Sequence, residues 1–198
     1  MLSIEMSGMG TDVRPAVPQR WADVAAVLTG RGGRDACWCQ RFTRHEAADN
    51  QAALEAEIAA APVPIGLVAY LDENPVGWSR VVPRQTLPGI MGNTALRRLY
   101  SDDDVRGASA AWWVSCFAVR RDHRGHGVGV ALLRAAADFA REHGAVVLDG
   151  HPVDVSRLTA KPSPSAVFTG TTAMFDAAGF EEIGRTYVSR PVMRKRLE

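Results

Sequence analysis

A glycine-rich turn between an apolar stretch and an amphipathic stretch most constrains how this chain can fold. Residues 112–119 are nearly all apolar and predict a strand buried on both faces. Apolar residues at helical spacing follow the turn as far as Gly144, the expected helix cap. The turn between them reads Arg124-Gly125-His126-Gly127-Val128-Gly129. Because backbone N–H groups converge where a helix starts, this segment predicts an anion-binding site.

Two common glycine motifs do not match this turn. A dinucleotide fingerprint that starts at Gly125 and Gly127 needs a third glycine at position 130, which is Val130. A phosphate-binding P-loop needs Gly-Lys-Ser or Gly-Lys-Thr, and no lysine is near. The remaining pattern is Arg124-x-x-Gly127-x-Gly129, in which the glycines allow close approach of the backbone and Arg124 adds a charged donor.

The rest of the chain predicts a mixed α/β fold with one sheet. Residues 1–11 resemble a loose leader, and residues 12–198 are expected to form a single domain. The predicted strands are 13–16, 65–71, 76–82, 112–119, 146–148, 181–188 and 192–197, and the predicted helices are 18–28, 45–61, 95–100, 128–143 and 171–178. The segment 83–110 lacks periodicity, so a lid or substrate wall and a disordered loop both stay open.

Composition excludes several classes of protein. The 198 residues carry a formal net charge of +1, which gives no general reason to bind nucleic acid or an anionic membrane. The first residues have neither a basic flank nor a long apolar run, so no signal peptide or membrane anchor is expected. Cys37, Cys39 and Cys116 form no regular framework, which is typical of a reducing compartment. We therefore expect a cytoplasmic protein.

With its flanking strand and helix, Val119–Gly129 resembles the acyl-CoA pyrophosphate loop of the GNAT-type N-acetyltransferase superfamily, whose pattern is Arg/Gln-x-x-Gly-x-Gly/Ala. Residues 75–78 resemble the start of that family's third strand, and residues 174–180 resemble its last helix and turn. The resemblance covers most of residues 12–197. Cys37-Trp38-Cys39 is also similar to an element of a largely uncharacterised bacterial subgroup.

The resemblance implies a central, mostly antiparallel, splayed sheet of six to seven strands flanked by helices. It also implies an acetyl-CoA-dependent N-acetyltransferase, a monomer or homodimer, that transfers the acetyl group directly to an amine, either a small molecule or a lysine side chain. The backbone around Phe117 and Val119 would pair with the pantetheine arm, and an N–H in the Phe117 region would serve the oxyanion. The implied cofactor-binding residues are Phe117, Ala118, Val119, Arg124, Gly125, His126, Gly127, Val128 and Gly129.

The proton-transfer residues depart from the family pattern. Phe175 occupies the place of a tyrosine that commonly serves as acid toward the thiolate, and Phe168 occupies the place of a common asparagine. A water, the hydroxyl of Thr169, Thr171 or Thr172, or Tyr187 are alternatives for the acid. The missing tyrosine also keeps open a different class of function, a non-catalytic acyl-CoA-binding or regulatory module.

Three further groups of residues carry competing interpretations. His151 follows the predicted strand 146–148 and is either the base that accepts the amine proton or an ordinary loop histidine. Cys37 and Cys39 lack the usual spacing of a zinc site, so packing or a wall of the substrate pocket is favoured, and no metal is expected. The acidic run 102–104 is either a solvated face or an attraction for a cationic amine.

Overall fold

A computed structural model of the chain describes residues 10–29, 37–43, 45, 47–101, 104, 108–163 and 165–198. These residues form a seven-stranded sheet in the order β1-β2-β3-β4-β5-β7-β6. Its strands are β1 (Asp12–Pro15), β2 (Gly66–Leu71), β3 (Asn74–Pro83), β4 (Ala111–Val119), β5 (Val147–Gly150), β6 (Glu181–Tyr187) and β7 (Arg190–Arg196). Neighbouring strands are antiparallel except β4 and β5, which are parallel. The predicted mixed α/β fold with one mostly antiparallel sheet is confirmed.

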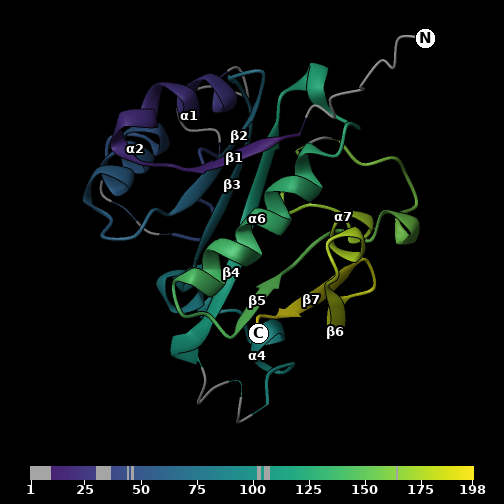
Figure 1. Cartoon of the computed structure of the whole chain (residues 1–198). Helices are drawn as coiled ribbons and strands as arrows, with labels where there is room; N and C mark the ends of the chain where they lie inside the picture. The colour runs from purple at the N-terminus through teal and green to yellow at the C-terminus, as the bar shows by residue number, and fades with distance from the viewer. Residues whose placement is uncertain are drawn as a thin grey trace, which may run out of the picture.

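Helices cover both faces of the sheet (Figure 1). The helices α1 (Trp21–Leu28) and α2 (Asn50–Ala60) lie on one face, and α6 (Val128–Glu142) and α7 (Thr172–Ala177) lie on the other. Because side chains alternate along a strand, Cys116 of β4 packs into the core under α1 and α2, whereas Phe117 packs into the core under α6 and α7. This double burial explains why β4 is apolar along nearly its whole length.

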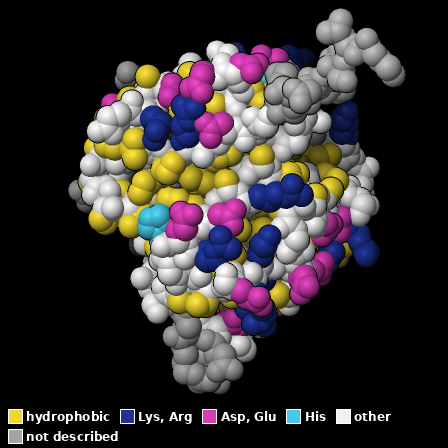
Figure 2. Space-filling model, viewed as in Figure 1, with side chains coloured by type: hydrophobic (Ala, Val, Ile, Leu, Met, Phe, Trp, Pro, Cys, Tyr) yellow, Lys and Arg dark blue, Asp and Glu magenta, His cyan; other side chains and the backbone are white. Residues whose placement is uncertain are grey.

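The helix α6 lies close to the sheet because β3 carries a glycine beneath its first turns. A Cβ at Gly77 would lie 2.8 Å from Val128 and 3.0 Å from Leu132, so a larger residue would push the helix start away. On the outer side of α6, Arg141 pairs with Asp138 at 3.1 Å, and Arg134 donates to the carbonyl of Ala177 at 2.8 Å. Figure 2 shows basic and acidic side chains interspersed over this part of the surface.

The segment 83–110 packs into the structure where it is described. It contains α3 (Pro88–Met91) and α4 (Thr94–Arg97), and Leu87, Ile90 and Leu96 are buried in the core under α1 and α2. Three large apolar residues spaced through an otherwise irregular sequence are enough to anchor the segment to the core. Residues 83–101 are therefore not a disordered loop.

Three element boundaries differ from the sequence expectation for local reasons. The helix α2 starts at Asn50 and not near His45, because the Asp49 side chain caps it by accepting from the N–H of Ala52. The turn between β2 and β3 consists only of Asp72 and Glu73, both at positive φ, so β3 begins earlier than expected. The expected leader lies largely outside the described residues.

Candidate active site

The turn that follows β4 opens directly onto the start of α6. Gly125 and Gly127 have φ values of 81° and 79°, a left-handed conformation that strains other residues. Gly127 is the N-cap of α6, and no side chain caps this helix. The first N–H groups of α6 are therefore left to bind an anion, and the partial positive charge of the helix start favours its binding. The exposed guanidinium of Arg124 lies beside them, held by a 3.1 Å hydrogen bond from Nε to the carbonyl of Val119.

A groove of about 600 Å³ runs from this turn to β4. One wall contains seven of the nine cofactor-binding residues implied by the resemblance: Phe117, Val119, Arg124, Gly125, Gly127, Val128 and Gly129. Ala118 does not line the groove because its side chain packs into the core on the opposite face of the sheet. His126 does not line it either and is exposed to solvent.

The other wall of the groove comes from residues that, apart from Thr171 and Met174, the sequence patterns did not single out. They are Pro162, Val167, Gly170, Thr171, Ala173 and Met174, from the connection between β5 and α7 and from the start of that helix. The one available signal was the length of the 151–171 connection, since long connections without regular structure often serve function. Of the hydroxyl groups proposed as acid, that of Thr171 belongs to this wall, whereas Tyr187 is exposed.

The strands β4 and β5 separate beside the groove. They pair only from Ala111 to Val114, and β4 continues without β5 as a neighbour. Beyond that point the N–H of Phe117 donates to the carbonyl of Phe168 at 2.7 Å. The Phe117 N–H, which the family resemblance assigns to the oxyanion, is thus already hydrogen-bonded within the chain. An incoming thioester carbonyl would have to displace the Phe168 carbonyl before it could accept the same hydrogen bond.

Phe175 is fully buried next to the groove. Its ring forms edge-to-face contacts with Phe117 and Phe180, with centroids 6.2 Å and 5.0 Å apart. A Cβ on Gly150 would lie 2.4 Å from the same ring, so the Phe175 ring occupies the space that a side chain at position 150 would need. The position that the family pattern gives to a proton donor is therefore occupied by a packing residue.

His151 lies at the end of β5, outside the residues that line the groove. Its Nε2 is 2.8 Å from the hydroxyl of Thr186 on β6. Burial, together with the nearby charge of Arg190, lowers the pKa of His151 to about 4. The imidazole is therefore neutral near pH 7 and able to accept a proton. Asp154, which follows it in the sequence, is instead paired with Arg185 at 2.9 Å.

Cys39 and Cys116 lie in the core on the α1 and α2 side, whereas Cys37 is exposed. The indole Nε1 of Trp78 donates to the sulfur of Cys39, which lies 2.8 Å from the sulfur of Cys116. Interactions with the thiols of Cys37 and Cys39, and then burial, raise the pKa of Cys116, so it stays a thiol at neutral pH and is a poor nucleophile. Within the described ranges no group of three His, Cys, Asp or Glu side chains has the arrangement of a metal site.

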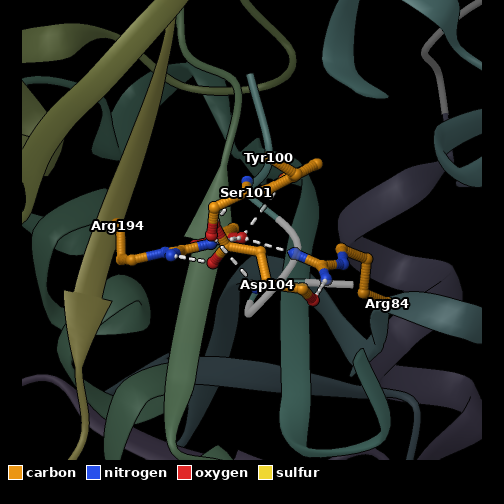
Figure 3. A network of polar contacts seen from close by, with 6 residues as sticks. Arg84, Tyr100, Ser101, Asp104 and Arg194 are labelled. Carbon is orange, nitrogen blue, oxygen red and sulfur yellow. Dashed lines mark hydrogen bonds and ion pairs between the residues drawn. The ribbon is translucent and has the colours of Figure 1, made fainter. Parts of the chain in front are cut away.

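A separate polar network surrounds the buried carboxylate of Asp149 within β5 (Figure 3). Arg194 donates to it from Nε at 2.7 Å and from Nη2 at 2.9 Å, and Arg84 donates at 3.0 Å. The hydroxyl of Tyr100 donates at 3.2 Å, and Arg194 also pairs with Asp104. Asp104 is therefore not available to attract a cationic amine, and the other two aspartates of the acidic run lie outside the described residues.

Family comparison agrees with this geometry. Residues 34–157, more than half of the chain, match the family model described as the acetyltransferase (GNAT) family. The chain belongs to this family of acetyltransferases. No curated protein matches the chain. In the described part of the chain, no helix has the length and apolar character needed to cross a bilayer.

Solved structures with low sequence identity share the fold. The GNAT domain of S. lividans PAT is 16% identical with a TM-score of 0.56, over 94% of this chain and 90% of that one. The protein yncA from Salmonella typhimurium, solved with its cofactor acetyl-CoA, is 17% identical with a TM-score of 0.53, over 95% and 94%. Mosquito arylalkylamine N-acetyltransferase like 5b is 15% identical with a TM-score of 0.59, over 95% and 100%.

Proposed function

We propose that this protein transfers the acetyl group of acetyl-CoA directly to a primary amine. The observation that carries the proposal is the uncapped start of α6, at which Gly125, Gly127 and Arg124 face a groove that leads to Phe117 on β4. A helix start of this kind suits a pyrophosphate, and the apolar length of the groove suits a flexible thioester arm. The groove volume of about 600 Å³ is in the range of ordinary ligand sites.

In this proposal the chain's residues act mainly by positioning and by hydrogen bonding. The N–H of Phe117 stabilises the charge on the thioester oxygen once the Phe168 carbonyl has moved away. The neutral imidazole of His151 accepts the proton that the attacking amine loses. Because a thiol has a pKa of about 8.5, the CoA thiolate can leave without a strong acid. This property makes a phenylalanine at position 175 compatible with catalysis; the groove hydroxyl of Thr171 could donate a hydrogen bond to the thiolate, while water supplies the proton.

Two observations favour a second candidate, an acyl-CoA-binding module without catalysis. Phe175 has no proton to give, and the N–H of Phe117 is bonded within the chain. Both features weaken the chemical half of the site and leave the anion-binding half intact.

A titration with acetyl-CoA followed by an amine panel separates these candidates. We expect calorimetry to detect acetyl-CoA binding and a thiol reagent to detect CoA release when primary amines are added. Binding without CoA release for any amine would favour the module. No binding at millimolar concentration would contradict both candidates.

Replacement of His151 by glutamine tests its role as base. We expect kcat at pH 7 to fall about tenfold, a modest effect because a base with a pKa far below the working pH contributes less than a matched one. Since the pKa of His151 is lowered to about 4, its base form should persist down to that pH and be lost only below it. Acetyl-CoA affinity should not change, and His45→Gln, at an exposed position, serves as the control. An unchanged dependence of rate on pH would rule out this role.

A further inference from the structure

Two arginines from separate elements meet at residues 168 and 169. The guanidinium of Arg41, from the connection between α1 and α2, lies 5.5 Å from the ring centroid of Phe168. Arg190, the first residue of β7, donates from Nη1 to the hydroxyl of Thr169 at 3.2 Å. Arg41 is exposed and Arg190 is half-buried, so one guanidinium faces solvent and the other lies deeper.

These two guanidinium groups differ from the arginines that are held by a carboxylate. Arg80 is paired with Glu57, Arg185 with Asp154, and Arg194 with Asp149. In the part of the chain that the structure describes, no carboxylate forms an ion pair with Arg41 or Arg190.

Burial and the positive charge of Arg41 both lower the pKa of Arg190. Two like charges held near one another without a counter-ion raise the energy of the free protein. An anion that binds between them would relieve that cost, and the planar guanidinium group is suited to the paired oxygens of a carboxylate or phosphate.

The position of the pair connects it with the groove. Val167 and Gly170 line the groove, whereas the Phe168 ring packs with the core on the other face of the sheet. The Phe168 carbonyl accepts from Phe117, so this short segment separates the predicted thioester position from the arginines. His151 lies on the arginine side, where Thr186 bonds both to its imidazole and to the carbonyl of Arg190. A molecule anchored at the arginines would have the imidazole beside it.

We propose that Arg41 and Arg190 bind an oxyanion group of the acetyl acceptor, which makes the acceptor a small primary amine that also carries a carboxylate or a phosphate. This inference rests on the proposed acetyl transfer and adds the class of substrate. It disfavours polyamines and lysine side chains in basic peptides, whose positive charges would be repelled by the arginines.

Matched pairs of amines test this subsite. Phenylalanine is compared with phenethylamine, and phosphoethanolamine with ethanolamine, by the rate of CoA release. We expect the anionic member of at least one pair to have the higher kcat/KM, and the better pair identifies carboxylate or phosphate as the preferred group. Arg190→Gln should raise KM for that anionic amine about tenfold, as loss of a charged hydrogen bond does, and should leave KM for the neutral amine unchanged. The readout is KM and not kcat, because the charge of Arg190 also lowers the pKa of His151 and its loss would act on both amines alike. Arg190→Lys should retain part of the preference, and the exposed Arg97→Gln is the control.

The outcomes distinguish this inference from the proposed function. If neutral and anionic amines react equally and Arg190→Gln affects KM for both alike, the subsite is wrong and acetyl transfer stands. If no amine reacts, acetyl transfer fails, and calorimetry of phenylalanine and phosphoethanolamine then decides the subsite. Binding that is lost in the double variant Arg41→Gln/Arg190→Gln supports the anion subsite, and equal or absent binding in the wild type and this variant overturns it.

Discussion

An Asp149→Asn variant should lose about 3–5 kcal/mol of unfolding free energy, the range observed when one partner is removed from a buried ion pair. Asp149 is fully buried, and both of its carboxylate oxygens accept hydrogen bonds from arginine. The amide of asparagine keeps the shape of the side chain and removes its charge. Arg84 is only 3% exposed and forms an ion pair with Asp149. In the variant, its positive charge would stay buried after this carboxylate partner is lost.

The effect should be large because the network joins parts of the chain that are far apart in sequence. Asp149 is 65 positions from Arg84 and 45 positions from Arg194. Arg84 also donates to the carbonyl of Asp104 at 2.9 Å, and its guanidinium lies 4.2 Å from the ring centroid of Tyr100 (Figure 3). Loss of one carboxylate charge therefore weakens the contact of the 84–104 region with β5 and β7.

Urea denaturation at pH 7 measures this change. The matched control is Asp138→Asn, because the Asp138 side chain is 63% exposed and pairs with Arg141 on the surface of α6. Exposed pairs contribute about 0–1 kcal/mol, so the control should unfold close to the wild type. An Asp149→Asn variant that unfolds within about 1 kcal/mol of the control would contradict the structural importance of the network.

The features that could be predicted from sequence are those encoded by neighbouring residues. The β4–turn–α6 unit depends on an apolar run, glycines at fixed spacing and a helical periodicity, all within residues 111–144. The turn between β2 and β3 and the last helix have equally local signals. The groove residues on β4 and the turn followed from the same short segment, together with the family resemblance.

The features that escaped prediction depend on contacts between distant residues. The hydrogen bond from Phe117 to Phe168 joins two backbone groups, which no side-chain pattern reports. Arg41 and Arg190 belong to no motif, and only the folded chain brings them to residues 168 and 169. Irregular sequence in 83–101 concealed a segment anchored by Leu87, Ile90 and Leu96, because a few buried residues suffice without periodicity.

A comparison of Gly127→Ala with Gly144→Ala should separate ligand binding from helix stability. The two glycines terminate the same helix at its opposite ends, with φ values of 79° and 82°, and a Cβ at either would meet nothing within 4 Å. Each alanine should therefore cost about 1 kcal/mol of stability from left-handed strain. The strain is the same in kind, so unfolding measurements should give similar losses for both variants.

Acetyl-CoA affinity should respond only to Gly127→Ala. Its Cβ projects at the start of α6, where Gly127 lines the groove, whereas Gly144 is not a lining residue. A methyl group there hinders the close approach of an anion to the first N–H groups of the helix, and we expect the dissociation constant to rise roughly 10- to 100-fold, the equivalent of about 1.4–2.8 kcal/mol. Calorimetry with acetyl-CoA on both variants provides the measurement. Equal affinity in the two variants would mean that the start of α6 does not hold the pyrophosphate, and the proposed orientation of acetyl-CoA along β4 would have to be abandoned.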